Sequence, residues 1–253
     1  MMKLLKYDFK RHSNTLLGSL VVLIIIQAAL SIIGTVKSWD PGVVIALSIF
    51  LYGIVFVFIS WLACKNYDTS IKSYARRLLP VRPVWTVISS LVLSWIAILV
   101  LFMIFAIHIY VYWQYGSVPS EITNDLSGIR AVDVISGVAA SFWLYSLWII
   151  TIFLAITIGA AVSIRGKLGA WVGILAYFIL QNVWSWLEEI FFGSLANIDR
   201  FGAFTIVEGT DYVDAAFGPG VLELTWGPFI FELVIMALMV WGITLLHRKK
   251  LEI

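Results

Sequence analysis

The chain has 253 residues, of which 61% are hydrophobic, 15% aromatic and only 13% charged. A soluble domain carries about 25% charged residues, so the composition excludes a water-soluble enzyme, and the aromatic content excludes a disordered chain. The single cysteine, Cys64, excludes a disulfide framework and a cysteine-based zinc cluster. The composition is typical of an integral membrane protein.

Six apolar runs are each long enough to cross the hydrocarbon core of a bilayer, which takes about 20 helical residues. In chain order they are 16–36, 43–63, 86–107, 134–164, 168–187 and 228–246. Each must be helical, because lipid offers no hydrogen-bond partners to an unpaired backbone. We therefore expect an all-α integral membrane protein, with six transmembrane helices in a single transmembrane domain over residues 1–253.

The basic residues indicate the orientation. Of the 17 Lys and Arg residues, 14 lie in the N-terminal segment, the second and fourth connections and the C-terminal tail. Most acidic residues lie in the other connections. The positive-inside rule then places both termini in the cytoplasm, and we expect a multi-pass protein of the plasma membrane. Residues 1–15 would form a basic cytoplasmic elbow, either a short helix on the inner leaflet or simply an orientation signal.

This orientation predicts a labelling pattern. On a Cys64→Ala background, a membrane-impermeant thiol reagent applied from outside should modify a cysteine introduced by Asp211→Cys but not one introduced by Ser73→Cys. Asp211 lies in an acidic connection, whereas Ser73 lies among basic residues. The reverse pattern would overturn the orientation.

The second connection, residues 64–85, contains the clearest local pattern. Its apolar and basic residues recur with the period of a helix, Ile71, Tyr74 and Leu78 on one face and Lys72, Arg76 and Arg77 on the other. Asp68 is a natural N-cap, and Pro80 ends the pattern. We expect a cytoplasmic amphipathic helix of about three turns. Periodicity alone allows it to lie passively on the membrane.

The stretch from Asn66 to Ser90 resembles the cytoplasmic loop of ABC-2 type transporter permeases. In that family an acidic, Thr-containing start leads through a short helix to a Leu-Pro stretch and the third span. The resemblance implies an ABC exporter bundle in which this helix couples to a separate ATPase subunit. The implied coupling residues are Asp68, Ile71, Lys72, Tyr74, Arg76, Arg77 and Leu78.

The resemblance also implies an assembly of two permease copies, identical or related, with two ATPase subunits that carry ATP and Mg²⁺. The chain itself has no P-loop motif, since Gly166-Lys167 is followed by leucine. It has no H-E-x-x-H motif either. We expect no catalytic residues, no metal site and no cofactor in this chain.

The fifth connection, residues 188–227, is too long for a simple loop. The resemblance implies short external or re-entrant helices there, and a plain surface loop is the alternative. Glu188 and Glu189 would form its solvated start. At the start of the fifth span, Gly169-x-x-x-Gly173 predicts close helix packing.

Three polar residues near the outer ends of the last two spans are candidates for a translocation path or outer gate: Glu232, Gln181 and Asn182. Ionisable residues inside spans are functional candidates by default, although Glu232 is shallow enough to snorkel outward. Hydrogen bonds between helices are the alternative role of Gln181 and Asn182.

The function expected from these features is a permease subunit of an ABC exporter for an amphipathic or peptide-like substrate. A secondary, ion-coupled transporter is one alternative, which the lack of charge near the membrane midplane disfavours. A non-transporting membrane protein, such as an immunity or sensor subunit, is the other. Nucleic acid is not an expected partner.

Overall fold

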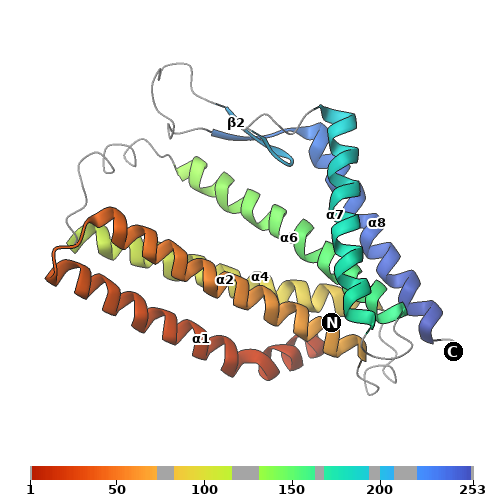
Figure 1. Cartoon of the computed structure of the whole chain (residues 1–253), viewed down its shortest axis with the longest axis horizontal. Coiled ribbons are helices and arrows are strands. Elements are labelled where there is room, and N and C mark those ends of the chain that lie inside the picture. Colours follow the sequence, from red (N-terminus) through yellow and green to blue (C-terminus); the bar gives the residue numbers. More distant parts are fainter. Residues whose placement is uncertain are drawn as a thin grey trace. The chain divides into compact units, whose positions relative to one another are not determined.

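The structure is a computed structural model that describes residues 2–72, 83–115, 131–162, 168–193, 200–207 and 221–251. Six helices account for most of these residues (Figure 1), namely α1 (Met2–Val36), α2 (Pro41–Lys72), α4 (Pro83–Tyr115), α6 (Ala131–Val162), α7 (Leu168–Phe192) and α8 (Trp226–Leu251). Three short strands precede α8: β1 (Arg200–Phe201), β2 (Phe204–Val207) and β3 (Val221–Leu224).

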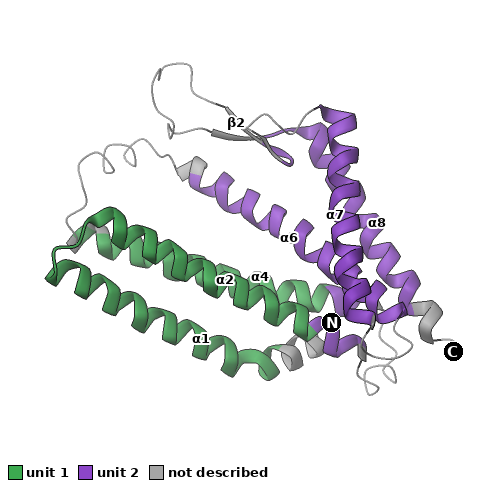
Figure 2. Cartoon of the chain, viewed as in Figure 1, with its two compact units in different colours: residues 1–66, 88–127 green, residues 67–87, 128–253 purple. Residues whose placement is uncertain are grey.

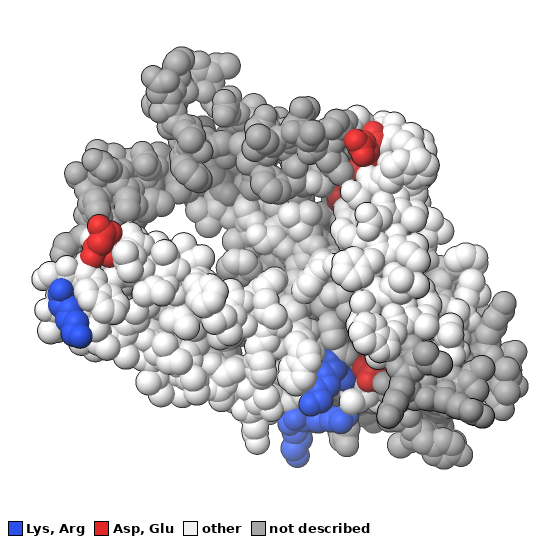
Figure 3. All heavy atoms as spheres, viewed as in Figure 1, with Lys and Arg blue, Asp and Glu red and all other residues white. Residues whose placement is uncertain are grey.

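All six helices are long and apolar enough to cross a membrane, and the shortest qualifying segment has 22 residues. Large apolar side chains face outward along them, for example Phe50, which is 66% exposed. On the face that Figure 3 shows, most of the described surface is uncharged, and charged side chains occupy only a few places. Lipid, unlike water, solvates such a surface. The predicted six-helix membrane architecture is confirmed, and the side on which the termini lie stays a prediction.

The chain divides into two compact units (Figure 2). Unit 1 comprises Met1–Asn66 and Ile88–Ser127, and unit 2 comprises Tyr67–Val87 and Gly128–Ile253. Unit 1 therefore contains α1 and most of α2 and α4. Unit 2 contains the last residues of α2 together with α6, α7, the strands and α8.

A tight turn holds α1 against α2 in unit 1. Ser38 has a positive φ of 50°, the left-handed conformation that commonly follows a helix end. The Asp40 carboxylate accepts the backbone N–H of Gly42 at 2.7 Å and so caps the start of α2. Beside the turn, a Cβ at Gly34 would lie 2.8 Å from a methyl carbon of Val44. The absence of a side chain at Gly34 thus permits the close approach of the two helices.

Polar side chains link the helices of unit 1 inside a largely apolar interior. Gln27 Nε2 in α1 donates to the Ser48 carbonyl in α2 at 3.0 Å. Ser31 Oγ in α1 lies 3.1 Å from His108 Nε2 in α4. Such bonds contribute on the order of 1 kcal/mol each in a membrane, because the groups would otherwise face hydrocarbon. Individual helices of unit 1 are therefore joined by specific bonds as well as by apolar packing.

Helix α6 is the centre of unit 2, and α7 and α8 both pack on it. Its residues Ile149 and Phe153 are 0% exposed. Glycines bring α6 and α7 closest together: a Cβ at Gly159 would collide with the Gly169 carbonyl oxygen and lie 3.1 Å from the Cα of Gly173. The close packing predicted for Gly169-x-x-x-Gly173 is confirmed.

The strands form an antiparallel sheet in the order β1-β2-β3. β1 and β2 form a hairpin in which Phe201 pairs with Phe204 around the turn at Gly202 and Ala203. Gly202 has a φ of 59°, as tight hairpin turns require. The residues that follow in β2, Thr205 to Val207, are all β-branched and favour a strand. The prediction of external or re-entrant helices in this connection is therefore wrong for residues 200–207 and 221–224.

Two helices run further than the sequence predicted. α1 is unbroken from Met2, so residues 2–15 do not form a separate elbow helix. His12, which lies in this part of α1, has its Nε2 3.1 Å from the Asn66 side-chain oxygen in α2. α2 continues through Asp68 to Lys72, so the prediction that Asp68 caps a separate helix is wrong. Asn66 and Tyr67 are both 0% exposed. Tertiary packing therefore stabilises α2 beyond the point where its sequence turns polar.

Candidate functional site

One aromatic side chain, Tyr67, attaches the end of α2 to α6 within unit 2. Its ring stacks on Phe153 with centroids 4.2 Å apart and an interplanar angle of 20°. Its hydroxyl lies 2.8 Å from Thr157 Oγ1. Because Thr157 donates its own hydroxyl proton to the Phe153 carbonyl at 2.8 Å, Tyr67 is the donor to Thr157. A stacked ring and a directed hydrogen bond thus fix the last turns of α2 on α6.

Trp61 and Lys65 form an exposed aromatic–cation pair on α2. Lys65 Nζ lies 4.9 Å from the centre of the Trp61 ring, and Trp61 is 53% exposed. Tryptophan and lysine together are typical of the membrane–water interface. From Lys65 to Lys72 the helix rises about 10 Å, so we expect the end of α2 to project beyond this pair on the side predicted to be cytoplasmic.

The predicted coupling residues begin in this projecting end. Asp68 and Ile71 are half-buried in the last turns of α2, and Lys72 ends the helix. The other predicted coupling residues, Tyr74, Arg76, Arg77 and Leu78, lie outside the described residues. No pattern in the sequence singled out Tyr67, because Thr157, its hydrogen-bond partner, is 90 residues away.

A second candidate site surrounds Glu232 in α8. Glu232 is 0% exposed, so it does not snorkel to the membrane surface as the sequence allowed. Trp143 Nε1 in α6 donates to its Oε2 at 2.5 Å. A Cβ at Gly202 would collide with its Oε1. The carboxylate therefore lies between an indole N–H of α6 and the hairpin turn of the sheet.

The hairpin turn is held over this carboxylate by bonds and apolar packing. Thr225 donates to the Ala203 carbonyl from both its backbone N, at 2.9 Å, and its Oγ1, at 2.8 Å. Ala203 and Phe204 are buried together with Ala140 of α6. The rings of Trp143 and Phe229 have centroids 4.3 Å apart. A buried carboxylate in this setting can hold a proton or pair with a cationic group, the usual roles of an acid within a membrane helix.

We expect Glu232→Leu to lower the thermal stability of the detergent-solubilised protein. Removal of the carboxylate leaves the N–H of the half-buried Trp143 without its acceptor, at a cost of about 1–3 kcal/mol. Glu232→Gln, which retains a carbonyl oxygen, should be milder. A double-mutant cycle with Trp143→Phe, followed by thermal unfolding, measures the coupling between the two side chains. Strictly additive losses would show that the Trp143–Glu232 bond contributes nothing.

The other two candidates for a path or gate, Gln181 and Asn182, differ in their surroundings. Gln181 is half-buried, whereas Asn182 is exposed. The Asn182 Nδ2 donates to the Phe178 carbonyl of its own helix at 2.7 Å, rather than to a neighbouring helix. Asn182 therefore faces away from the interior of unit 2.

Glu188 is 1% exposed, whereas its neighbour Glu189 is exposed. The prediction of a solvated pair is therefore wrong for Glu188 and correct for Glu189. The physical reason is that α7 does not end at this pair but continues to Phe192. There it packs on α8, with the rings of Phe192 and Phe231 centred 5.5 Å apart.

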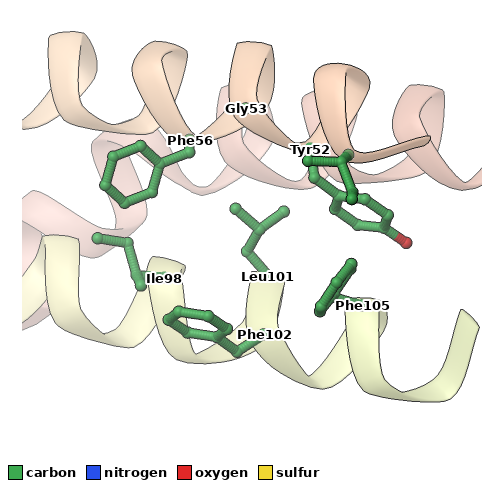
Figure 4. Close-up of a pocket in the computed structure, with 8 residues that line it drawn as sticks. Tyr52, Gly53, Phe56, Ile98, Leu101, Phe102 and Phe105 are labelled. Carbon is green, nitrogen blue, oxygen red and sulfur yellow. The ribbon is translucent and has the colours of Figure 1, made fainter. Parts of the chain in front are cut away.

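A groove of about 250 Å³ lies between α2 and α4 in unit 1 (Figure 4). Phe56 of α2 and Ile98, Leu101 and Phe102 of α4 line it, and the missing side chain of Gly53 widens it. Apart from Tyr52, the lining side chains are apolar and suit a hydrocarbon chain. Among the residues that the structure describes, no three His, Cys, Asp or Glu side chains group closely enough to hold a metal ion.

Comparison with known proteins found no relative of this chain: no protein-family model, curated protein or solved structure matches it. The conclusions on its function therefore depend on its own residues.

Proposed function

We propose that this chain is the membrane-spanning subunit of an ATP-driven exporter of the ABC-2 type. It would couple ATP hydrolysis on separate subunits to the export of an amphipathic or peptide-like substrate across the plasma membrane. The observation that carries the proposal is the attachment of Tyr67 to α6. It ties the basic segment that follows α2 to the central helix of unit 2.

Helix α6 supplies a mechanical path through unit 2. It meets Tyr67 through Phe153 and Thr157, and it meets Glu232 through Trp143. Trp143 and Phe153 are separated by about 15 Å along the helix. A displacement of the end of α2 would therefore move α6 and reach the carboxylate and the sheet turn packed beside it.

The energy source in this proposal is a partner subunit that binds ATP and Mg²⁺. Arg76 and Arg77 would meet acidic groups on its surface, since basic side chains favour such contacts and steer association. Two facing ATPase subunits would each need a docking segment. One chain offers one segment of suitable length, so two permease copies would complete the assembly.

Co-expression with the ATPase and native mass spectrometry test this assembly. We expect a complex of two permease copies and two ATPase subunits. In the same complex, Tyr67→Ala should preserve ATP hydrolysis but reduce transport, because the stack on Phe153 is lost. Tyr67→Phe keeps the stack and should transport better than Tyr67→Ala. A transport-competent single copy without an ATPase would overturn the proposal.

The burial of Glu232 favours a second candidate, an ion-coupled transporter, because such proteins use buried carboxylates as ion or proton sites. Transport driven by a proton or sodium gradient without ATP, and abolished by Glu232→Gln, would support this candidate. Transport that needs ATP hydrolysis and survives Glu232→Gln would support the exporter.

A further inference from the structure

Helix α7 presents its two sides to different surroundings. One side carries Gly173, which approaches the backbone of α6 closely. Asn182 follows nine positions later, two and a half turns at 3.6 residues per turn, and therefore lies on the opposite side. The side chains on this outer side are large and apolar, and they are well exposed: Trp171 74%, Leu175 63%, Phe178 60% and Trp186 62%.

An amide interrupts this apolar side within the candidate span. The candidate membrane span is Gly169–Phe192, so Asn182 lies about 20 Å from one end and about 15 Å from the other. Its Nδ2 donates to the Phe178 carbonyl. That bond uses one of the two N–H groups, and the oxygen of the amide is an acceptor with two lone pairs. Hydrocarbon offers no hydrogen-bond partner to the second N–H or to the amide oxygen.

We infer that this side of α7, centred on Asn182 and flanked by Leu175, Phe178 and Trp186, is the contact surface for a second copy of the same chain. A two-fold axis beside α7 brings a residue close to its own counterpart. An amide contains both a donor and an acceptor, so Asn182 complements the partner's Asn182 without any other residue type. Side-chain amides are established partners between membrane helices. Lipid would cover the apolar flanks equally well but would leave the second N–H and the oxygen of the amide without hydrogen-bond partners.

This surface identifies the second permease copy of the proposed assembly as an identical chain. The inference depends only on α7 crossing the membrane, so its test needs neither an ATPase nor transport. If the two-plus-two assembly were not found, the inference about α7 would still stand. If the inference about α7 failed, the exporter could still pair this chain with a related, non-identical permease.

Cysteine cross-linking in native membranes tests the surface directly. On the Cys64→Ala background, single substitutions Leu175→Cys, Phe178→Cys, Asn182→Cys and Trp186→Cys are oxidised and analysed on non-reducing gels. Phe178→Cys, which lies near the proposed axis and retains the amide, should give the most disulfide-linked dimer, and Asn182→Cys, which removes the amide, should give less. Leu238→Cys in α8, at a side chain that is 57% exposed, is the matched control and should give little.

A second measurement tests the role of the Asn182 amide itself. Asn182→Leu makes α7 more apolar, so insertion and folding should be unaffected. It should weaken dimerisation in liposomes by about 5- to 30-fold, the range measured for polar contacts between membrane helices. Asn182→Gln should retain most of the affinity. Equal cross-linking at Leu238→Cys and the α7 positions, or an unchanged dimer with Asn182→Leu, would overturn the inference.

Discussion

Replacement of Gly159 by leucine is expected to abolish folding of the chain, and replacement by alanine to destabilise it by at least about 2 kcal/mol. A Cβ at this position would collide with the carbonyl oxygen of Gly169 and press on the Cα of Gly173. Both obstacles are backbone atoms, which cannot turn aside as a flexible side chain can. Relief would require α6 and α7 to separate along their shared contact, at the centre of unit 2.

The matched control is Gly137→Ala in the same helix. A Cβ at Gly137 meets nothing within 4 Å, and alanine favours a helix over glycine by up to about 1 kcal/mol. The two alanine variants change the same atoms and should shift the unfolding temperature in opposite directions. Size-exclusion chromatography of detergent extracts after heating measures the difference. If Gly159→Ala is as stable as Gly137→Ala, then α6 and α7 do not pack as closely as described.

Reversal of two charges, Arg76→Glu with Arg77→Glu, should reduce ATP-driven transport at least tenfold and prevent co-purification of the ATPase. This follows from the proposed docking role, since like charges at an interface cost several kcal/mol. Expression and monodispersity should stay near normal, because an exposed ion pair contributes only about 0–1 kcal/mol to stability.

The control for this double reversal is Lys249→Glu with Lys250→Glu at the end of α8. It makes the same change in net charge on the side of the membrane predicted to be cytoplasmic, at residues outside the proposed docking segment. We expect transport to persist in this variant. Normal transport after the Arg76 and Arg77 reversal would identify their segment as a passive helix on the membrane surface.

The sequence determined how many helices cross the membrane and approximately where. Hydrophobic length is a local property, since a lipid solvent requires every crossing segment to satisfy its backbone within itself. The observed spans therefore contain the predicted runs almost completely. The helix contact at Gly169 and Gly173 was also readable, because only small residues allow two helix backbones to approach so closely.

The residues of the hairpin favour a turn and a strand, but the prediction for this segment followed the resemblance to permeases instead. A glycine followed shortly by three β-branched residues, Thr205 to Val207, favours a strand after a tight turn. The expectation of re-entrant helices came from the family resemblance and not from these residues. Local turn chemistry was the better guide for this segment.

Only the tertiary structure decided which polar groups are buried, and against what. Glu232 and Tyr67 each depend on a hydrogen-bond partner about 90 residues away, Trp143 and Thr157 respectively. Burial of a carboxylate or a phenol is tolerated where such a partner satisfies it. No pattern within one helix specifies a partner on another, so hydropathy alone placed Glu232 near the surface and ended the second span before Tyr67. The candidate sites follow from the packing of helices that lie far apart in the chain.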